Sequence, residues 1–343
     1  MKQLLNTLYV QTQGTYVRLD HDTLKLEVER EMKFQIPLHH LGSIVIFGNV
    51  LVSPFLIHRC AEDGRSLVWL SEHGQFKGRL AGSTTGNVLL RRSQHEALSS
   101  ADSTLLIARH IVAGKLQNAR SVLMRAAREA NDAGDRTSLS AAAQIQAQSI
   151  QSTERAEDLD KLRGIEGYAA KAYFGAFTSM VRTNRPAFTF TERSRRPPRD
   201  PINALLSFVY TLLAGECVAA CEGVGLDPQM GFLHALRPGR PALALDLMEE
   251  LRTPLADRLV LTLVNRGQIK PDDFIDRPGG AIHLTDDARK LLLTAYQKRK
   301  QEEVPHTIAG AKVPLGLVAH IQARLLARHL RGDTPTYQPF IQR

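Results

Sequence analysis

The apolar residues of this chain change their spacing once, near Ser93, and that change limits the folds open to it. Before Ser93 they alternate with polar residues, as in TLYVQTQGTYVRLDHDTLKLEVE, which predicts half-buried strands. Further runs at FQIPL, SIVIFG and SLVWLS bring the expected total to about eight strands. After Ser93 the apolar residues recur about every 3.6 residues, as on amphipathic helices. We therefore predict an α+β fold of two domains, a small N-terminal β-sheet domain (residues 1–92) and a larger all-helical domain (residues 93–343).

The length and charge of the chain narrow its partners without identifying one. A chain of 343 residues can bury two cores, and its formal net charge of +9 suits a polyanionic partner. Basic ribosomal and membrane-surface proteins share that bias. The three cysteines, Cys60, Cys217 and Cys221, follow no zinc spacing, and an odd count without a secretory signal indicates the cytoplasm. No stretch reaches the roughly 20 apolar residues that cross a bilayer, so no membrane partner is expected.

One carboxylate lies on the apolar side of a predicted helix. In LDKLRGIEGYAAKAYFGAF the apolar residues share one arc, and Glu166 falls inside that arc. A carboxylate on a buried face must be paired, protonated or bound to a cation, because desolvating it alone costs several kcal/mol. Two interpretations stay open at this point: a buried ion pair with Arg163 or Arg182, or a metal ligand.

A histidine and further acids lie in MGFLHALRPGRPALALDLMEELR. Pro241 suits the first turn of a helix, on which Asp246 and Glu249 project together from adjacent turns. His234 lies upstream, on an apolar segment that RPGRP turns back toward this helix. A histidine and carboxylates brought together in this way resemble half of a metal site. Taken alone, the pattern fits a solvated acidic face and a packing histidine better.

The order of four blocks makes the chain recognisable: GIEGYAAKAYF, RRPPRDPINALLSFVYTLL, GFLH and LALDLMEELR. Together they resemble the Cas1 family, the CRISPR-associated integrases of the spacer-acquisition complex, over almost the whole chain. RTPLADRLVLTLVNRGQI is similar to the version found in subtype I-C. The resemblance implies that Glu166, His234 and Glu249 hold a divalent metal ion, Mg²⁺ or Mn²⁺, and that Asp246 is a further catalytic acid. Many relatives carry Asp where this chain has Glu249, which reaches one methylene farther.

The resemblance also implies a reaction and an assembly. The expected activity is that of a metal-dependent DNA endonuclease and integrase of CRISPR adaptation. Such an enzyme joins the 3′-hydroxyl ends of short prespacer DNA fragments to the boundary of the CRISPR repeat by transesterification. The β domain would pair with its copy in a homodimer, and a Cas2 dimer would bridge two homodimers. The alternatives are a stand-alone metal-dependent nuclease and a non-catalytic DNA-binding scaffold, which would leave the position of Glu166 unexplained.

A basic, irregular segment, TNRPAFTFTERSRRPPRDP, follows the Glu166 helix. Arginines can grip phosphates with two hydrogen bonds, and Phe188 and Phe190 could stack on an unpaired base. A flexible, solvated charge run is the alternative. Asp200 and Pro201 then start a helix, on which Tyr210 either packs or contacts a substrate. The residues expected to contact DNA are Arg193, Arg195, Arg196, Arg199 and Asn203.

The remaining segments are predicted to support these groups. KLQNARSVLMR, which begins with Lys115, resembles a family block near the nucleic acid, and the solvated face of a core helix explains it equally well. Helices are predicted over PLADRLVLTLVNRGQIK and LTDDARKLLLTAYQKRKQEEV, with a hairpin or loop at RPGGAIHLT. A final basic helix, VPLGLVAHIQARLLARHLRG, suits phosphates or a partner, and TPTYQPFIQR is expected to be an extended tail.

Overall fold

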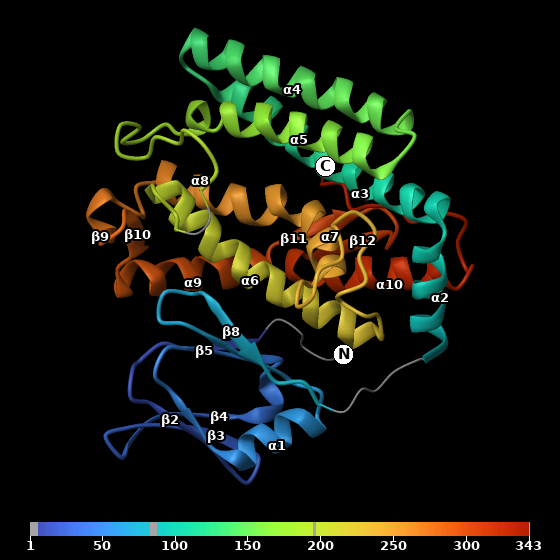
Figure 1. The fold of residues 1–343 in the computed structure, drawn as a ribbon. Coiled ribbons are helices and arrows are strands. Elements are labelled where there is room, and N and C mark those ends of the chain that lie inside the picture. Colours follow the sequence, from blue (N-terminus) through green and yellow to red (C-terminus); the bar gives the residue numbers. More distant parts are fainter. Residues whose placement is uncertain (1–5, 83–87, 195–196, 343) are drawn as a thin grey trace. The chain divides into compact units, whose positions relative to one another are not determined.

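The chain divides into two compact units, Met1–Gly86 and Asn87–Arg343 (Figure 1). The computed structural model describes residues 6–82, 88–194 and 197–342 of them. The boundary falls before the expected residue 92, because the first helix of the second unit already begins at Val88. Each unit has a core of its own and is described by itself.

Strands dominate the first unit, in agreement with the alternating pattern. The described residues form two four-stranded sheets, one of order β1-β5-β7-β8 and one of order β4-β3-β2-β6. Side chains from both sheets, Val17, Leu24 and Ile44 among them, share one buried core. The strands are β1 Thr7–Val10, β2 Tyr16–Asp20, β3 Thr23–Val28, β4 Glu31–Pro37, β5 Ser43–Phe47, β6 Leu51–Val52, β7 Ser66–Leu70 and β8 Phe76–Arg79.

The sequence pattern misses one helix of this unit, α1 (Pro54–Glu62). The Ser53 hydroxyl accepts the backbone N–H of Leu56 at 3.2 Å, which caps the helix. Pro54 occupies the first turn, where it has no hydrogen bond to lose. A helix this short between strands gives too few turns for a clear helical period.

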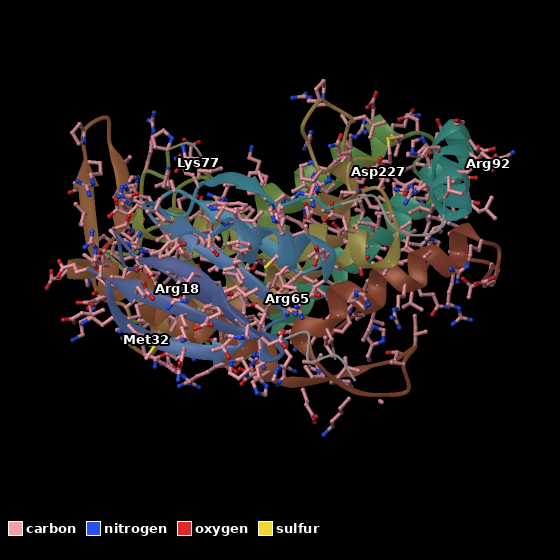
Figure 2. The ribbon with its side chains drawn as sticks, turned by 90° about the horizontal axis from the view of Figure 1, so that it is seen from below. Arg18, Met32, Arg65, Lys77, Arg92 and Asp227 are labelled. Carbon is pink, nitrogen blue, oxygen red and sulfur yellow. The ribbon has the colours of Figure 1, made fainter. Side chains whose placement is uncertain are left out.

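The edge strand β4 carries exposed apolar side chains. Met32 is 54% exposed and Phe34 46% exposed on this strand. Figure 2 shows Met32 on the same sheet as Arg18, which donates to Glu27 across β2 and β3 at 2.6 Å. An edge strand with apolar side chains on the surface is suited to packing against another chain.

The second unit is mostly helical, and short polar side chains begin its longer helices. The side chains that accept a backbone N–H in a first turn are Ser100, Asp132, Asp158, Asp200 and Thr285. The helices are α2 Val88–Ser99, α3 Ala101–Glu129, α4 Ala133–Glu154, α5 Leu159–Gly175, α6 Pro201–Val224, α7 Ala242–Leu251, η3 Arg252–Asp257, α8 Arg258–Asn265, α9 Asp286–Gln301 and α10 Val318–Leu330, with shorter turns at η2 Thr178–Met180, η4 Pro271–Asp273 and η5 Leu315–Leu317.

The prediction that this unit is all-helical is wrong in detail, because it contains hairpins. β9 (Phe274–Arg277) and β10 (Ala281–Leu284) pair in antiparallel fashion, which confirms the hairpin option at RPGGAIHLT. Their turn uses Gly279 and Gly280, whose φ angles are +87° and +74°. Only glycine adopts such angles without steric cost.

A second hairpin replaces a stretch that the sequence pattern predicts to be helical. β11 (Glu303–His306) and β12 (Ala311–Pro314) are antiparallel and follow α9 directly. The helix ends because Pro305 disfavours helical geometry at the residue before it. The predicted helix runs to Val304 and therefore includes the first two residues of β11.

The central helix α6 contributes many of the buried apolar side chains of this unit. Cys217 and Cys221 on it are fully buried, as small apolar side chains commonly are. Among the described residues, α6 is the one helix long and apolar enough to cross a membrane, yet 67% of its most apolar window is buried inside the protein. It packs against α7, α10 and β10. This burial is that of a core helix.

The long helix α3 lies beside the elements that carry the predicted site. It contacts α4, α5, α7 and η3. The amide of Asn118 on α3 donates to the carbonyl oxygens of Glu250 and Phe340 at 2.9 Å each. Gly114, one turn earlier, leaves space for Pro339, because a Cβ there would lie 2.5 Å from the proline ring. The extended C-terminal tail is therefore bound to both α3 and α7.

Candidate functional site

The acidic side of α7 is buried. Asp246 and Glu250 have no exposed surface and Glu249 is 3% exposed. The interpretation of these acids as a solvated face is therefore wrong, because α7 is packed between α3, α6 and α10. Each buried carboxylate must have partners within the protein.

Asp246 holds the segment that carries His234. Its Oδ2 accepts the backbone N–H groups of Phe232 and Leu233 at 2.6 and 3.0 Å. Its Oδ1 accepts the backbone N–H of His234 at 3.0 Å and lies 2.7 Å from the ring Nδ1 of the same residue. Gly231 permits this close approach, because a Cβ at that position would lie 2.5 Å from the backbone of Ala242. Asp246 thus fixes the orientation of the imidazole.

The three side chains predicted to bind metal lie close together, linked through Glu249 and Lys115. The ammonium of Lys115 on α3 hydrogen-bonds Glu166 Oε1 on α5 and lies 2.7 Å from Glu249 Oε2 on α7. His234 Nε2 lies 3.6 Å from Glu249 Oε1. Arg252 Nη2 approaches the same Oε1 at 3.0 Å. The structure therefore places two carboxylates at one amino group, with the imidazole of His234 and the guanidinium of Arg252 beside the second carboxylate, that of Glu249.

The sequence-based alternative for Glu166, an ion pair with Arg163 or Arg182, is wrong about the partner. Arg163 donates to the carbonyl of Leu233 and to Asp160, and Arg182 pairs with Glu129. The partner of Glu166 is Lys115, which comes from a helix earlier in the chain. A sequence pattern cannot supply this pairing, because the contact depends on how α3 packs against α5.

The charges of Glu249, Lys115 and Arg252 keep one another ionised. Burial by itself raises the pKa of Glu249, but the positive charges of Arg252 and Lys115 outweigh it and lower that pKa to about 2. Burial also opposes the charge on Lys115, yet Glu249 and Glu166 raise its pKa above the ordinary value. The same balance, with Glu249 as the main anion, raises the pKa of Arg252. Both cations and the Glu249 carboxylate are thus charged at neutral pH.

The donor set fits a divalent metal ion in its chemistry. Glu249 Oε2 is buried and accepts no well-aligned hydrogen bond, although the Lys115 ammonium lies at ion-pair distance. Two carboxylates and one imidazole suit Mg²⁺ or Mn²⁺. Within residues 6–82, 88–194 and 197–342, no three His, Cys, Asp or Glu side chains already stand at metal-binding separations.

The structure contradicts one predicted DNA contact, the buried Asn203, and gives another, Arg193, partners within the protein. Asn203 is fully buried, and its Oδ1 accepts the backbone N–H of Ser194 at 3.1 Å and Arg193 Nη1 at 2.5 Å. Arg193 also donates to Ser207 Oγ at 3.0 Å, and its guanidinium lies 5.4 Å from the ring centre of Tyr210. Both residues are occupied in holding the segment before α6 onto that helix.

The other arginines of this segment differ from Arg193. Arg199 is exposed, as a phosphate contact requires. Arg195 and Arg196 lie outside the described residues. Phe188 and Phe190 are buried, and Phe190 stacks on Phe174 with ring centres 5.5 Å apart. The two phenylalanines are core residues, so the prediction that they stack on a base is wrong.

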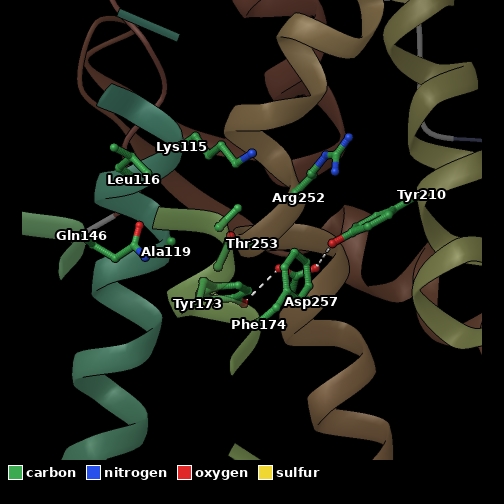
Figure 3. A pocket seen from close by; sticks show the side chains of 11 residues that line it. Lys115, Leu116, Ala119, Gln146, Tyr173, Phe174, Tyr210, Arg252, Thr253 and Asp257 are labelled. Atoms are coloured by element: carbon green, nitrogen blue, oxygen red, sulfur yellow. Dashed lines mark hydrogen bonds between the residues drawn. The ribbon is translucent and has the colours of Figure 1, made fainter. Parts of the chain in front are cut away.

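A pocket beside the cluster contains residues that the sequence did not single out. It is lined by Lys115 and Arg252 and, farther in, by Asp257 (Figure 3). Asp257 accepts the hydroxyls of Tyr210 at 2.6 Å and Tyr173 at 2.9 Å. Burial raises the pKa of Asp257 despite these two hydrogen bonds. Tyr210 therefore packs against Asp257 and lines this pocket.

Arg252 and Asp257 are the ends of η3, a π-helical turn. Such turns are rare and occur often at functional sites. The one sequence signal for the ion pair between Glu249 and Arg252 was their spacing, since residues three apart meet on a helix. Lys115 gave no such signal, because lysines on long helices are usually solvated.

Comparisons with known proteins indicate one family, over most or all of the chain. A family model described as CRISPR associated protein Cas1 matches residues 8–298. The CRISPR-associated endonuclease Cas1 of Moorella thermoacetica is 60% identical over 343 residues, which is 100% of both chains. Its counterpart from Chlorobaculum tepidum is 49% identical over 343 residues, again 100% of both chains.

Solved structures show the same fold. The structure of a Cas1 protein from Thermotoga maritima has a TM-score of 0.81 and 25% identity, and the match covers 95% of this chain and 97% of that one. A casposase bound to integration product has a TM-score of 0.82 at 21% identity, over 97% of this chain and 92% of that one. At that identity the second likeness shows the fold alone.

Proposed function

The chain belongs to the Cas1 family of CRISPR-associated endonucleases, and we propose that it is a metal-dependent DNA endonuclease and integrase of CRISPR adaptation. The observation that carries the proposal is the closeness of the three side chains: Glu166 and Glu249 share the Lys115 ammonium, and His234 Nε2 lies 3.6 Å from Glu249 Oε1. Side chains that surround a cation of the protein itself are well placed to hold a divalent one. The buried Glu249 Oε2, which lacks an aligned donor, supports this function.

Glu166, His234 and Glu249 would hold a Mg²⁺ or Mn²⁺ ion, which polarises the phosphodiester and stabilises charge on the leaving oxygen. Asp246 prepares His234 for this role. When Nδ1 gives its hydrogen to Asp246, Nε2 keeps its lone pair and faces Glu249. Asp246 is a positioning residue in this scheme, because it is fully buried and its oxygens already accept hydrogen bonds.

The proposed reaction conserves phosphodiester bonds. The 3′-hydroxyl oxygen of a short DNA fragment forms a bond to a phosphorus atom at the repeat boundary and loses its proton to solvent. The bond from that phosphorus to its former 3′ oxygen breaks, and this oxygen takes up a proton. No ATP and no covalent protein intermediate are required. With water as the nucleophile, the same exchange hydrolyses the strand.

Exposed Arg199, together with Arg195 and Arg196, is proposed to contact the DNA backbone. For the assembly, we propose a homodimer formed through the N-terminal unit. The exposed Met32 and Phe34 of the edge strand β4 support this interface. Two homodimers bridged by a Cas2 dimer would then form the complete integration complex.

A strand-transfer assay tests the function. The wild-type protein, with Cas2 and Mn²⁺, is expected to join a labelled 3′-hydroxyl fragment to a plasmid that carries the repeat. Glu166→Ala, His234→Ala and Glu249→Ala should each abolish the joined product, whereas Lys171→Met, on the exposed side of α5, should not. Activity that survives all three substitutions would contradict the proposed site.

The same assay separates the alternatives. A stand-alone nuclease would cut DNA without Cas2 and form no joined product. A DNA-binding scaffold would bind fragments with neither product, and would do so equally well without a metal ion. The assignment to subtype I-C stays a prediction, which requires preferred joining at a repeat of that subtype over repeats of others.

A further inference from the structure

Among the residues that the structure describes, the amino group of Lys115 forms ion pairs with two carboxylates and with no other group. Its side chain is 15% exposed, and its ammonium contacts Glu166 Oε1 and Glu249 Oε2. These are the two carboxylates proposed as metal ligands. Its helix is fixed one turn later by Asn118, which donates to the backbone carbonyl of Glu250 on α7. The amino group is therefore aimed at the ligand oxygens by a rigid element.

We propose that Lys115 is a built-in counter-cation that occupies the metal position in the metal-free protein and must leave it when a divalent ion binds. The inference rests on the proposed metal site and adds a competitor to it. Two carboxylates drawn together in a largely buried place repel each other unless a positive charge lies between them. Lys115 supplies that charge until a metal ion does.

The two cations of the cluster differ in their freedom to leave. Arg252 is held from a second side, because its guanidinium lies 4.9 Å from the ring centre of Tyr210. It also approaches Glu249 Oε1, on the side away from Lys115. Lys115 has a flexible four-carbon stem and a compact charge. The lysine is therefore the cation that a metal ion can displace.

The structure provides a place for the displaced amino group. The pocket that Lys115 lines has a volume of about 30 Å³, enough for one ammonium-sized group. Its wall includes the side chains of Gln146 and Asp257 (Figure 3). In this proposal, rotation of the four-carbon stem carries the charge into this pocket, whose lining includes the Asp257 carboxyl as well as the Arg252 guanidinium.

Calorimetric titration with Mn²⁺ alone tests the competition on the full chain. Lys115→Met keeps the length of the side chain and removes the charge. It should bind Mn²⁺ more tightly than the wild type by roughly tenfold, the change that about 1.4 kcal/mol produces. Without metal it should unfold at a lower temperature, and Mn²⁺ should restore more of its stability than it adds to the wild type. Lys171→Met, on the helix of Glu166, should match the wild type in both measurements.

The outcomes distinguish this inference from the metal site itself. Equal or weaker Mn²⁺ binding by Lys115→Met, beside normal binding by the wild type and none by Glu249→Ala, would overturn the role of Lys115 and leave the site intact. No binding by either the wild type or Lys115→Met would overturn both.

A second measurement needs no variant and covers the case in which Lys115→Met does not fold. In the wild type, an amine-reactive reagent followed by mass spectrometry should modify Lys115 at a different rate with Mg²⁺ than without metal, because the amino group leaves the two carboxylates for the pocket. Modification of exposed Lys171 should not respond to Mg²⁺. A rate at Lys115 that Mg²⁺ leaves unchanged would show that the ammonium does not move.

Discussion

Glu249 and Glu250 are neighbours on α7, yet their carboxyl groups lie in opposite electrostatic environments. Burial opposes the charge of Glu249, but Arg252 and Lys115 lower its pKa to about 2. Glu250 faces the C-terminal tail, and no cation lies beside it among the residues that the structure describes. Burial raises the pKa of Glu250 to about 8, despite hydrogen bonds from Tyr337 and Phe340. One helix thus presents an ionised carboxylate to the site and a proton-retaining one to the tail behind it.

This contrast predicts a pH dependence of stability. The folded protein holds a proton on Glu250 up to a pKa of about 8, whereas the unfolded chain releases it near the ordinary glutamate pKa of 4.5. Between these values the native state binds more protons, so the free energy of unfolding falls as pH rises. Since a difference of one in pKa between the folded and unfolded states corresponds to about 1.36 kcal/mol, the total decrease is on the order of a few kcal/mol.

Glu250→Gln should remove this dependence, because a neutral amide has no proton to lose and still offers a carbonyl oxygen to the Phe340 N–H. Denaturant unfolding at several pH values between 5 and 8 (roughly the window set by the two pKa values) measures the difference from the wild type. The variant should gain relative stability as pH rises. Glu154→Gln, at an exposed position of α4, should show no such trend. A wild-type curve parallel to that of Glu250→Gln would show that Glu250 is ionised in the fold.

The arginine segment predicts a salt effect that separates DNA contact from a structural role. Neutralising Arg195, Arg196 and Arg199 together should weaken DNA binding across sequences. The slope of log affinity against log salt concentration should become shallower by roughly 0.9 for each phosphate that the variant no longer neutralises. Fluorescence titrations of labelled DNA at several salt concentrations give this slope, and Mn²⁺ affinity should hardly change. If the slope stays at the wild-type value, the segment is a solvated charge run.

Asn203→Ala serves as the matched structural control for that experiment. Asn203 is buried and bonds the backbone of Ser194 and the side chain of Arg193. Removing its side chain takes away the acceptor of the Ser194 N–H and one of the acceptors of Arg193, which costs about 1–3 kcal/mol of stability. The variant should unfold more easily while keeping the salt slope of the wild type.

The fold and most of the site could be predicted from the sequence where the signal is local. The change of period near Ser93 places the strands and helices, and the position of Glu166 in an apolar arc marks a carboxylate that needs a cation. The pairing of His234 with Asp246 follows from a turn that brings two nearby segments together. For His234 and Glu249, the resemblance to the family turned an ambiguous pattern into a ligand set.

The misassignments arise where long-range packing decides. Lys115 reaches the site from α3, so nothing in the local sequence separates it from a solvated lysine. Asn203 and Arg193 stand beside a basic segment, which favours their interpretation as DNA contacts, but they satisfy each other and the backbone. The start of the hairpin β11–β12 is missed because the predicted helix extends to Val304, two residues into β11. In each case, either the contacting residue is distant in the sequence or the sequence pattern fits two different structures.

The last prediction separates the roles of Asp246 and Glu249. Glu249→Ala removes a proposed ligand, so Mn²⁺ affinity and strand transfer should disappear together. The metal-free variant should also be less stable, by about 3–5 kcal/mol, because Lys115 and Arg252 would face each other without the carboxylate between them. Calorimetry and thermal unfolding measure the two effects.

Asp246→Asn should act differently, because Asp246 touches the site only through His234. The amide replaces one carboxylate oxygen by an NH₂ group, which cannot accept the backbone N–H groups that Asp246 now binds. The turn that carries His234 should loosen, and Mn²⁺ affinity should fall by about 10–100-fold while remaining measurable. Strand transfer should fall more steeply, since it needs both the metal ion and an oriented imidazole. If Asp246→Asn abolished Mn²⁺ binding while Glu249→Ala retained it, Asp246 would be the ligand and Glu249 the positioning residue.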